Sequence, residues 1–461
     1  MSSDIKPING PSMSQIAGNT SAHDIITRIK TKDVKVGVVG LGQVGLPTAL
    51  TIAKVGYNVI GYDTNSSLLD ELSKGITAIQ EDEIKNLLVR GLSTDRIMFG
   101  SSYQSLSAAD IIIVCVPTPL GRDLSADLSY LSKAVNGIAS HCVNSKKLLI
   151  IESSIPPMTM SGLVVPILEK ATGKKLGSGF LLAFCPERLS PGQALNGISD
   201  TVRIIGATDS ESYEAAKTLY SNFTDAQLVC SSFETAEVSK LAENAYRDVN
   251  IAFANELAMV CQHYNVDVTE VIQIANTHPR VNIHNPGPGV GGPCLPKDPY
   301  LLLSKSRISA SLIEKARSIN DSMPRYVVDL MVRKLEIISP AKQANKLKIG
   351  ILGTAYKPNV NDIQNSPTKR IILELRKRGY TEIIVHDPIC KETFGMRSSD
   401  LKSLLKNCDC IILVTGHDAY ASLSPNDFKP SCIIVDAARK LRKKEFIGSK
   451  RTYYTAPGLD G

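Results

Sequence analysis

The stretch that decides the fold is VKVGVVGLGQVGLPTALTIAKVGYNVIGYD, residues 34–63. A β-branched run over 34–39 leads into a glycine turn, a helical pattern follows, and a second apolar run covers 58–62. β-branched residues favour strands, and strands that alternate with helices are typical of a doubly wound parallel sheet. We therefore expect an α/β fold that begins with a Rossmann-like unit.

The glycine turn carries the pattern of a dinucleotide site. Gly40, Gly42 and Gly45 form G-x-G-x-x-G between the strand and the helix, and Val44 lies within the turn. The glycines permit a tight turn, close approach of a pyrophosphate and close packing of the helix on the sheet. Asp63 ends the second strand, where its carboxylate can accept from ribose hydroxyls and would repel a 2′-phosphate. The sequence therefore predicts binding of NAD rather than NADP.

Further apolar runs, DIIIVCVPTP, KLLIIESS, FLLAFCPE and VRIIGA, extend this unit to about residue 225. Ligands of such sheets bind beyond the carboxyl ends of the strands. Thr118 and Ser154 follow two of these strands. They are either cofactor contacts or ordinary turn residues. Glu187 and Arg188 follow a third, at the same crevice or in a surface turn.

A helical pattern of some 30 residues follows, and then the stretch LKIGILGTAYKP repeats the strand-to-turn frame. When the two frames are aligned, Ala355 occupies the position of Gly42, and Pro358 occupies the position of Gly45. The second frame therefore lacks two of the glycines that a dinucleotide site requires. We expect two Rossmann-like doubly wound domains joined by a long central helix. The expected divisions are a disordered tail (1–33), an NAD-binding domain (34–225), a central helical and dimerisation domain (226–335) and a second Rossmann-like domain (340–461).

Composition narrows the class of protein. Of 461 residues, 43% are hydrophobic, and no apolar run is long enough to span a membrane. The N-terminus lacks the apolar core of a secretory signal, so we expect a cytoplasmic protein with reduced thiols. No CxxC pair or His/Cys cluster has zinc spacing, so no metal is expected. The net charge of +7 includes the basic run ARKLRKKEF, which we interpret as a solvated face rather than a nucleic-acid site.

The loop NPGPGVGGPCLPKDP, residues 285–299, holds Cys294 in a backbone that neither a helix nor a central strand tolerates. Lys297 and Asp298 follow closely, and a nearby cation lowers the pKa of a thiol. From the residues alone, Cys294 is either a nucleophile or a buried loop cysteine without a chemical role. Lys240 and Asn244 share one face of the long helix. Glu237 and Glu243, on the same helix, are expected to pair with lysines at the surface.

These pieces occur in the order of a known family. GLGQVGLP, VPTP, ESSIPPMT, CPERLSPG, AEVSKLAENAYRDVNIAFANE, PGPGVGGPCLPKDP and GTAYKPNVNDIQNSP resemble the motifs of the UDP-glucose/GDP-mannose dehydrogenase family over nearly everything after residue 33. The resemblance implies that a sugar C6 alcohol is oxidised to a carboxylate with two NAD. It also implies a thiohemiacetal and then a thioester on a cysteine.

The resemblance also assigns roles. It makes Cys294 the nucleophile, with Lys240 and Asn244 stabilising charge on the C6 oxygen. Glu187 would act as acid or base or order water, and Asp298 would assist hydrolysis. The implied substrate-binding residues are Arg188, Arg280, Lys297 and Lys357, with Arg280 able to come from a neighbouring subunit of a homodimer or higher homo-oligomer.

The chain departs from the family pattern at three positions. Gln364 replaces an arginine that commonly contacts substrate, Asn361 replaces an acid, and Cys185 replaces an asparagine. The sequence GPGVGG resembles the branch that acts on UDP-N-acetylhexosamines, which favours UDP-N-acetyl-D-mannosamine. UDP-N-acetylglucosamine and UDP-glucose remain alternatives. So do a two-electron dehydrogenase that does not need Cys294 and a non-catalytic nucleotide-binding module.

Overall fold

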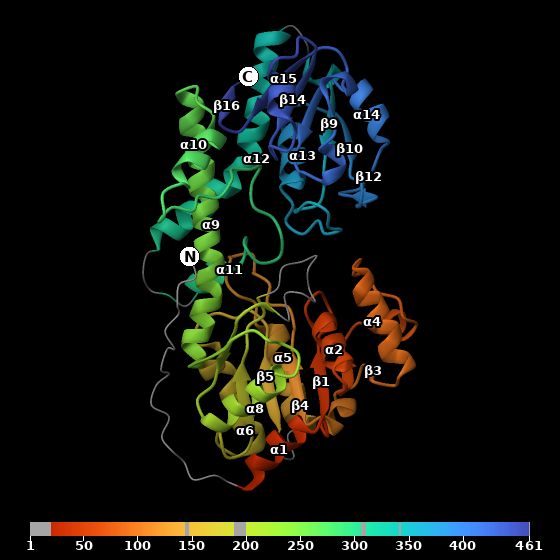
Figure 1. Cartoon of the computed structure of the whole chain (residues 1–461), viewed down its shortest axis with the longest axis vertical. Coiled ribbons are helices and arrows are strands. Elements are labelled where there is room, and N and C mark those ends of the chain that lie inside the picture. Colours follow the sequence, from red (N-terminus) through yellow and green to blue (C-terminus); the bar gives the residue numbers. More distant parts are fainter. Residues whose placement is uncertain are drawn as a thin grey trace. The chain divides into compact units, whose positions relative to one another are not determined.

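The computed structural model describes residues 20–142, 147–188, 200–304, 306, 310–340 and 343–460. The chain divides into two compact units (Figure 1). Unit 1 comprises Met1–Ala242 and Tyr300–Ser306, and unit 2 comprises Glu243–Pro299 and Arg307–Gly461. Each unit is built on a mostly parallel sheet with helices on both faces, which confirms the expected fold class.

The sheet of unit 1 has the strand order β3-β2-β1-β4-β5-β6-β7-β8. All neighbouring strands are parallel except β6 and β7. The chain adds β2 and β3 on one side of β1 and then β4 on the other side. Such a switch in strand order places a ligand crevice at the carboxyl end of β1. The strands are β1 (Lys35–Val39), β2 (Asn58–Tyr62), β3 (Ile97–Gly100), β4 (Ile111–Val114), β5 (Leu148–Ile151), β6 (Leu181–Phe184), β7 (Arg203–Gly206) and β8 (Leu228–Ser231).

Helices bury their apolar sides on both faces of this sheet. One face is covered by α1 (Thr20–Lys30), α2 (Gly45–Lys54), α3 (Ser66–Ser73), α4 (Asp82–Ser93) and α8 (Ser210–Tyr220). The other face is covered by η1 (Tyr103–Ala108), α5 (Ser129–Cys142), η2 (Met160–Val164) and α6 (Val165–Thr172). β-branched residues dominate the strands between them because both faces of a parallel sheet are buried.

The folded part of unit 1 begins before Val34. Helix α1 lies within the segment expected to be a disordered tail, and that expectation was wrong for its residues. Ile25 and Ile29, one helical turn apart, are 4% and 0% exposed in the core under α8. This i, i+4 apolar pair marks an amphipathic helix. Residues 1–19 of the expected tail lie outside the described residues.

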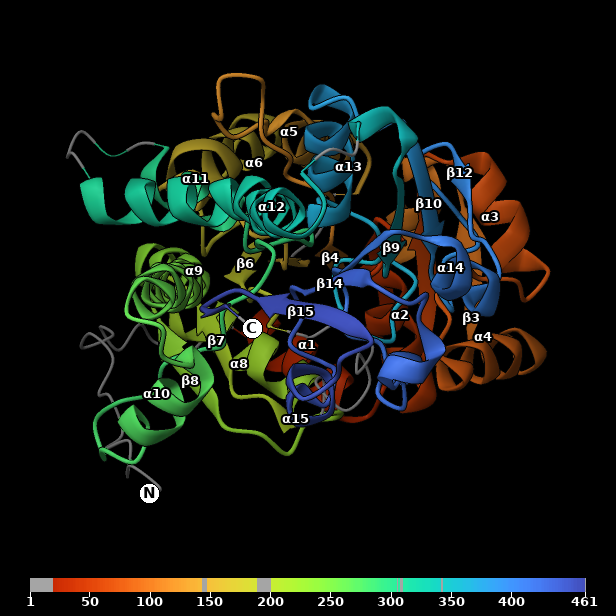
Figure 2. The same cartoon turned by 90° about the horizontal axis from the view of Figure 1, so that it is seen from above.

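Helix α9 (Phe233–His263) confirms the predicted long helix. It follows β8 directly, and the division between the two units falls within it. Figure 2 views this helix nearly end-on. Residues on α9 thus belong to both units.

The sheet of unit 2 has the strand order β10-β9-β13-β14-β15-β16. All pairs are parallel except β15 with β16. The strands are β9 (Lys348–Leu352), β10 (Glu382–His386), β13 (Cys410–Leu413), β14 (Cys432–Asp436), β15 (Thr452–Ala456) and β16 (Leu459–Asp460). A separate hairpin joins β11 (Glu392–Thr393) and β12 (Met396–Arg397).

Helices again cover both faces in unit 2. One face packs on α12 (Ser311–Ile338) and α13 (Pro367–Lys377), and the other on α14 (Leu401–Asn407) and α15 (Lys443–Ile447). The remaining elements are α10 (Val268–Ala275), α11 (Asp298–Leu303), η3 (Ala344–Lys346), η4 (Asp418–Tyr420) and η5 (Pro425–Asp427). Among the described residues, every helix is too short or too polar to cross a membrane.

Candidate active site

The glycine turn after β1 has the shape that a dinucleotide requires. Gly40 has a φ of 90°, and a Cβ there would lie 2.8 Å from the carbonyl oxygen of Cys115. A Cβ at Gly45 would lie 1.8 Å from the carbonyl oxygen of Gly40, so only glycine lets α2 approach the turn. A Cβ at Gly42 would meet no atom within 4 Å, so the backbone there is open to a phosphate.

The groups around this turn complete the fit to NAD. Val44 stands at the N-terminal end of α2, and its side chain caps none of the N–H groups there, which can therefore serve a phosphate. Asp63 accepts hydrogen bonds from the N–H groups of Leu41 and Asn65, both at 2.9 Å. A carboxylate offers about four acceptor positions, so Asp63 can also accept from ribose hydroxyls.

Two predicted cofactor contacts meet at the ends of β4 and β5. The hydroxyl of Thr118 donates to the carbonyl oxygen of Ser154 at 2.6 Å. At the end of β6, the N–H of Glu187 donates to the carbonyl oxygen of Glu152, and the Arg188 guanidinium donates to that of Val202. The rest of the CPERLSPG motif, from residue 189, lies outside the described residues.

Sequence reasoning missed a buried polar cluster below these strand ends. Glu152, 1% exposed, accepts from the Tyr220 hydroxyl at 2.6 Å and from the Cys115 thiol at 3.3 Å, and lies 3.8 Å from the Arg203 guanidinium. Burial raises the pKa of Cys185 to about 11, and it raises the pKa of Cys115 as well. Both cysteines are therefore thiols at neutral pH. An acid at the end of an apolar strand, in IIESS, was the available signal for this cluster.

One face of α9 is buried and polar. Lys240 and Asn244 are 7% and 5% exposed, which agrees with their predicted shared face. Glu237 is fully buried, so the expectation of a surface pair was wrong for it. Its carboxylate accepts from the N–H groups of Met158 and Met160, both at 2.7 Å, and ties the loop after β5 to the helix. Burial raises the pKa of Glu237, although these hydrogen bonds oppose the rise.

Four predicted residues gather in unit 2 around the start of α11. The amide of Asn244 donates to the carboxylate of Asp298 at 2.6 Å, and Asp298 is fully buried. The N–H groups of Lys297 and Asp298 both donate to the carbonyl oxygen of Cys294, at 2.9 and 2.8 Å. The ammonium of Lys297 lies 4.0 Å from the same carboxylate. Cys294, which is half-buried, thus heads a backbone turn that ends at a buried acid.

The backbone before the cysteine is joined to the loop between β9 and α13. The N–H of Gly292 donates to the carbonyl oxygen of Gln364 at 2.8 Å, and the Asn365 amide donates to the carbonyl oxygen of Gly292 at 3.0 Å. Cβ atoms at Gly291 and Gly292 would each lie 2.7 Å from side-chain atoms of Tyr356. The glycine pair is therefore required by the close approach of an aromatic ring.

Lys357 lies on the same loop, directly after Tyr356. Burial raises the pKa of Tyr356 to about 12, and the negative charges of Asp362 and Cys294 add to this rise. The Tyr356 hydroxyl thus stays protonated at neutral pH. Asn361, one of the departures from the family pattern, accepts from the Cys390 thiol at 3.2 Å.

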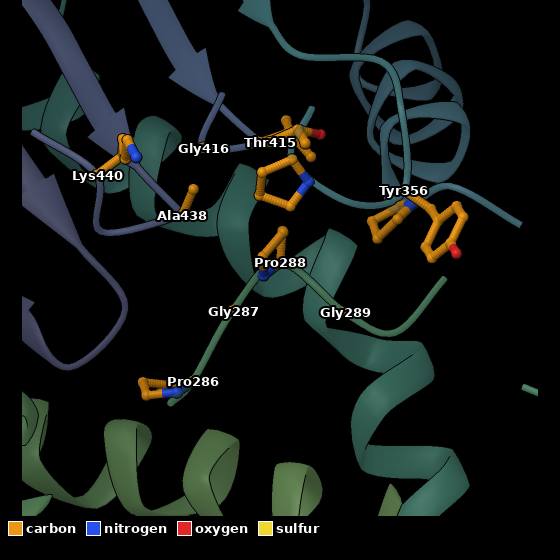
Figure 3. A pocket seen from close by; sticks show the side chains of 12 residues that line it. Pro286, Gly287, Pro288, Gly289, Tyr356, Thr415, Gly416, Ala438 and Lys440 are labelled. Carbon is orange, nitrogen blue, oxygen red and sulfur yellow. The ribbon is translucent and has the colours of Figure 1, made fainter. Parts of the chain in front are cut away.

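A pocket of about 360 Å³ opens at the carboxyl ends of β13 and β14 (Figure 3). In Figure 3, Tyr356 and Lys440 lie on opposite sides of the loop Pro286–Gly289. The volume is within the range of small-molecule sites, roughly 300–1,000 Å³. The pocket is lined by Pro286, Gly287, Pro288, Gly289, Tyr356, Pro358, Pro367, Val414, Thr415, Gly416, Ala438 and Lys440.

The basic run 438–446 is a solvated face only in part: Arg442 and Lys444 are exposed, whereas three other basic residues make specific contacts. Lys440 lines the pocket and its ammonium lies 2.8 Å from the Asp418 carboxylate. Arg439 and Lys443 both pair with Asp267, the N-cap residue of α10. No feature of the run itself separates these three residues from its other charges.

A buried polar ladder supports the wall of the pocket formed by residues 286–289. The N–H of Gly287 donates to the Asn255 side chain at 2.9 Å, and the amide of Asn255 donates to Asn320 at 2.9 Å. Asn320 in turn donates to Asp248, which also accepts from the Arg317 guanidinium at 2.6 Å. The four side chains that support Gly287 are at most 2% exposed. A buried charge pair thus fixes the position of a loop peptide.

Arg280 lies on the exposed loop after α10. Asn250 on α9 anchors this loop, because its side chain donates to the carbonyl oxygen of Asn282 and accepts from the N–H of His284. The predicted site residues thus fall into both units. Unit 1 holds Gly40, Gly42, Val44, Gly45, Asp63, Thr118, Ser154, Glu187, Arg188 and Lys240; unit 2 holds Asn244, Arg280, Cys294, Lys297, Asp298 and Lys357.

Three family models match successive parts of the chain. They are those of the UDP-glucose/GDP-mannose dehydrogenase family: its NAD binding domain at residues 34–224, its central domain at 234–322 and its UDP binding domain at 350–443. These matches confirm the resemblance that the sequence motifs indicate.

Named relatives cover most of the chain. A UDP-N-acetyl-D-mannosamine dehydrogenase of Pyrococcus horikoshii is 38% identical over 90% of this chain and 97% of its own length. An NDP-N-acetyl-D-galactosaminuronic acid dehydrogenase of Ralstonia nicotianae is 34% identical over 87% of this chain and 95% of its own. The solved structure of UDP-D-ManNAc dehydrogenase from P. horikoshii has a TM-score of 0.85 at 36% identity, covering 92% of this chain and 99% of the other.

Proposed function

Because this chain belongs to the UDP-glucose/GDP-mannose dehydrogenase family, we propose that it oxidises UDP-N-acetyl-D-mannosamine to the 6-carboxylate, UDP-N-acetyl-D-mannosaminuronate. The chain is an NAD-dependent UDP-sugar dehydrogenase, since all three family domains are present and its relatives are named as such enzymes. The choice of sugar is supported by those names and by the sequence GPGVGG before the cysteine. UDP-N-acetylglucosamine and UDP-glucose are the alternatives.

NAD, when bound at the glycine turn of unit 1, supplies a hydride acceptor for each of two oxidations. The Cys294 thiolate attacks the C6 aldehyde and forms a C–S bond, which gives a thiohemiacetal. Loss of the remaining C6 hydride gives a thioester, and water cleaves the C–S bond to release the carboxylate and return the thiol. One alcohol, two NAD and one water thus give one carboxylate, two NADH and protons. A reduced thiol suits the cytoplasm, which we propose as the compartment.

The side chains around this chemistry have separable roles. Lys240 and Asn244 stabilise negative charge on the C6 oxygen, and the Asp298 carboxylate orients the Asn244 amide through the 2.6 Å hydrogen bond. Asp298 also assists the water that cleaves the thioester, and Glu187 holds or moves its proton. The pocket of unit 2 takes the UDP group. The family resemblance gives Lys357 and Lys297 the role of supplying positive charge, and Arg188 and Arg280 that of contacting the sugar.

One observation carries the covalent mechanism. Cys294 is half-buried, and hydrogen bonds fix the backbone on both sides of it, at Gly292 and at its own carbonyl oxygen. A fixed, accessible thiol suits a nucleophile. Cys294→Ala is therefore expected to lower the rate of uronate formation about 10⁴-fold or more, since the residues of such a covalent site act as a unit.

The test measures NADH and uronate in the same reaction, with Cys185→Ala as a matched control in the core of unit 1. The wild-type enzyme should form two NADH per uronate. One NADH per sugar, or uronate formation by Cys294→Ala at the wild-type rate, would instead identify a two-electron dehydrogenase. NAD and UDP binding without turnover on any nucleotide sugar would identify a binding module. A panel of UDP- and GDP-sugars, compared by kcat/KM, tests the choice of UDP-N-acetyl-D-mannosamine, which should rank first.

We also propose that the enzyme is a homodimer or higher homo-oligomer assembled through α9. Tyr246, Phe253 and Val260 recur every seven residues, so they form one stripe along the helix, and they are 63%, 53% and 46% exposed. Apolar residues so exposed are typical of a surface that another chain covers. Phe253→Glu is expected to lower the mass measured by light scattering to that of a monomer, and an unchanged mass would reject this interface.

A further inference from the structure

We infer that Asn365 is a positioning residue for Cys294, because its side-chain amide holds the peptide two residues before the thiol. The inference rests on the proposed nucleophilic role of Cys294. Asn365 lies just before α13, in unit 2, and is exposed, although its hydrogen bond to Gly292 is part-buried. It was not among the site residues that the sequence predicted.

The contacts form a clamp across one residue. The N–H of Gly292 donates to the carbonyl oxygen of Gln364 at 2.8 Å, and the carbonyl oxygen of Gly292 accepts from the Asn365 amide at 3.0 Å. Both polar groups of Gly292 are therefore held by two adjacent residues. On the other side of the cysteine, the N–H groups of residues 297 and 298 donate to its carbonyl oxygen. Only a short stretch of backbone around the thiol lies between these anchors.

The residues within the clamp leave little room for adjustment. Gly292 has a φ of 91°, which disfavours any other residue, and Tyr356 packs where its Cβ would be. Figure 3 shows Tyr356 beside the loop where it continues past Gly289. The ring blocks one side of Gly292, and the two hydrogen bonds hold the peptide groups on either side of its Cα. These contacts therefore set the direction in which the chain reaches Cys294.

Asn365 combines two properties that can be separated by mutation. Its φ is 50°, in the left-handed region that asparagine tolerates better than most residues. If the backbone conformation were its only contribution, glycine would replace it without loss. If the amide positions Cys294, glycine would preserve the conformation and still lose the function.

The chemistry makes such positioning matter. The same sulfur must attack the C6 carbon of an aldehyde and later present a thioester to water. A displacement of about 1 Å between reacting atoms can cost about 100-fold in rate. Of the residues in the clamp, Tyr356 lines the proposed nucleotide pocket, whereas Asn365 and Gly292 do not. Losing the Asn365 amide should therefore affect the covalent steps more than the binding of UDP.

The experiment compares Asn365→Gly with Asn265→Gly in the full-length enzyme. Asn265 also has a left-handed backbone, with a φ of 54°, and is exposed beyond the end of α9. For Asn365→Gly we expect kcat to fall roughly 10- to 100-fold while KM for the UDP-sugar and the inhibition constant for UDP change less than about twofold. Hydrogen exchange over residues 290–294 should accelerate at least about fivefold. Asn265→Gly should match the wild type in all four measurements.

A second variant guards against loss of fold. Asn365→Asp keeps the shape of the side chain but has no amide to donate, so it should reproduce the defect of Asn365→Gly. The inference is overturned if Asn365→Gly retains kcat within about twofold, or if KM and the UDP inhibition constant rise together with no change in hydrogen exchange. In that case the inference about Asn365 fails but the proposed function stands, provided that Cys294→Ala still abolishes uronate formation. Uronate formation by Cys294→Ala would instead defeat the proposed function itself.

Discussion

The two Rossmann-like sheets begin with nearly the same backbone turn. Gly40 after β1 has a φ of 90°, and Gly353 after β9 has a φ of 89°. In both, a Cβ would collide with the backbone of the neighbouring strand's end, at Cys115 in unit 1 and at Thr415 in unit 2. The strand-to-turn frame is thus shared, and the difference in ligand must come from what surrounds it.

The acid at the end of the second strand shows this difference most directly. Asp63 in unit 1 is partly exposed and accepts from two backbone N–H groups. Asp387 in unit 2 is 1% exposed. It accepts from the N–H groups of Thr354, Ala355, Ile389 and Cys390, from the Thr354 hydroxyl and from His417. One carboxylate can serve a ribose, whereas the other is used entirely within the protein.

The chain after each turn also differs. Helix α2 begins at Gly45, five residues after Gly40, so its N-terminus faces the turn. Helix α13 begins only at Pro367, and the longer loop before it carries the residues that reach the pocket and the cysteine loop. Unit 2 thus keeps the frame but replaces a helix N-terminus with a loop, which explains how one fold can serve NAD in one unit and a UDP-sugar in the other.

The largest effect is expected from Asp387→Asn. The amide NH₂ of asparagine cannot accept the hydrogen bonds that the buried Asp387 carboxylate accepts, so buried donors are left unpaired. The free energy of unfolding should fall by about 3–5 kcal/mol. Burial alone would raise the pKa of Asp387, but hydrogen bonds from His417 and from backbone N–H groups lower it below its usual value. The unfolded carboxyl titrates near 4, so the charged form stabilises the fold above about pH 4 and this contribution is lost as pH falls below it.

Urea unfolding at pH 7 and at pH 3 measures this effect. The difference between wild type and Asp387→Asn should be large at pH 7 and should narrow at pH 3. Asp63→Asn is the matched control at the same place in the other unit and should change the free energy of unfolding by less than about 1 kcal/mol. Equal destabilisation by the two variants would contradict the comparison.

The next effect is on NAD affinity. Gly45→Ala forces a Cβ to within 1.8 Å of the Gly40 carbonyl oxygen, so α2 must move away from the turn. We expect NAD to bind about 100-fold more weakly, or about 2.7 kcal/mol, as measured by calorimetry, with UDP binding unchanged. Gly162→Ala is the control, since a Cβ there meets no atom within 4 Å. Weakened UDP binding in Gly45→Ala would mean that the units do not bind their ligands separately.

Much of the fold was predictable because its signals are local. The pattern of residues 34–63 gave the first βαβ unit, its glycines and its acid, and LKIGILG gave the second frame. Helix α1 could have been found from Ile25 and Ile29, but its polar neighbours led to the prediction of a tail. The cysteine loop was identifiable because its chemistry lies within residues 294–298.

The supports of the site were not predictable in the same way. Asn255 contacts Gly287 across 32 residues, and Asn320 contacts Asp248 across 72. An asparagine in a helical pattern is usually solvated, and no local signal distinguishes one that faces a loop peptide. Lys440 was hidden for the same reason within a run of charges. Such contacts depend on how distant segments fold together, which periodicity and composition do not encode.

The smallest expected effect is on the preference between NAD and NADP, which distinguishes Asp63 from Asp387 by their roles in binding rather than in stability. Asp63→Asn keeps an oxygen that can accept from ribose but removes the negative charge that would repel a 2′-phosphate. We expect KM for NAD to rise about tenfold, or about 1.4 kcal/mol, and kcat/KM for NADP to improve relative to NAD. Asp387→Asn, although far more disruptive to stability, should leave the preference between NAD and NADP unchanged. The burial and hydrogen bonds of Asp387 argue that only Asp63 contacts the cofactor. An equal change of preference in both variants would contradict this, because it would give Asp387 a cofactor role as well.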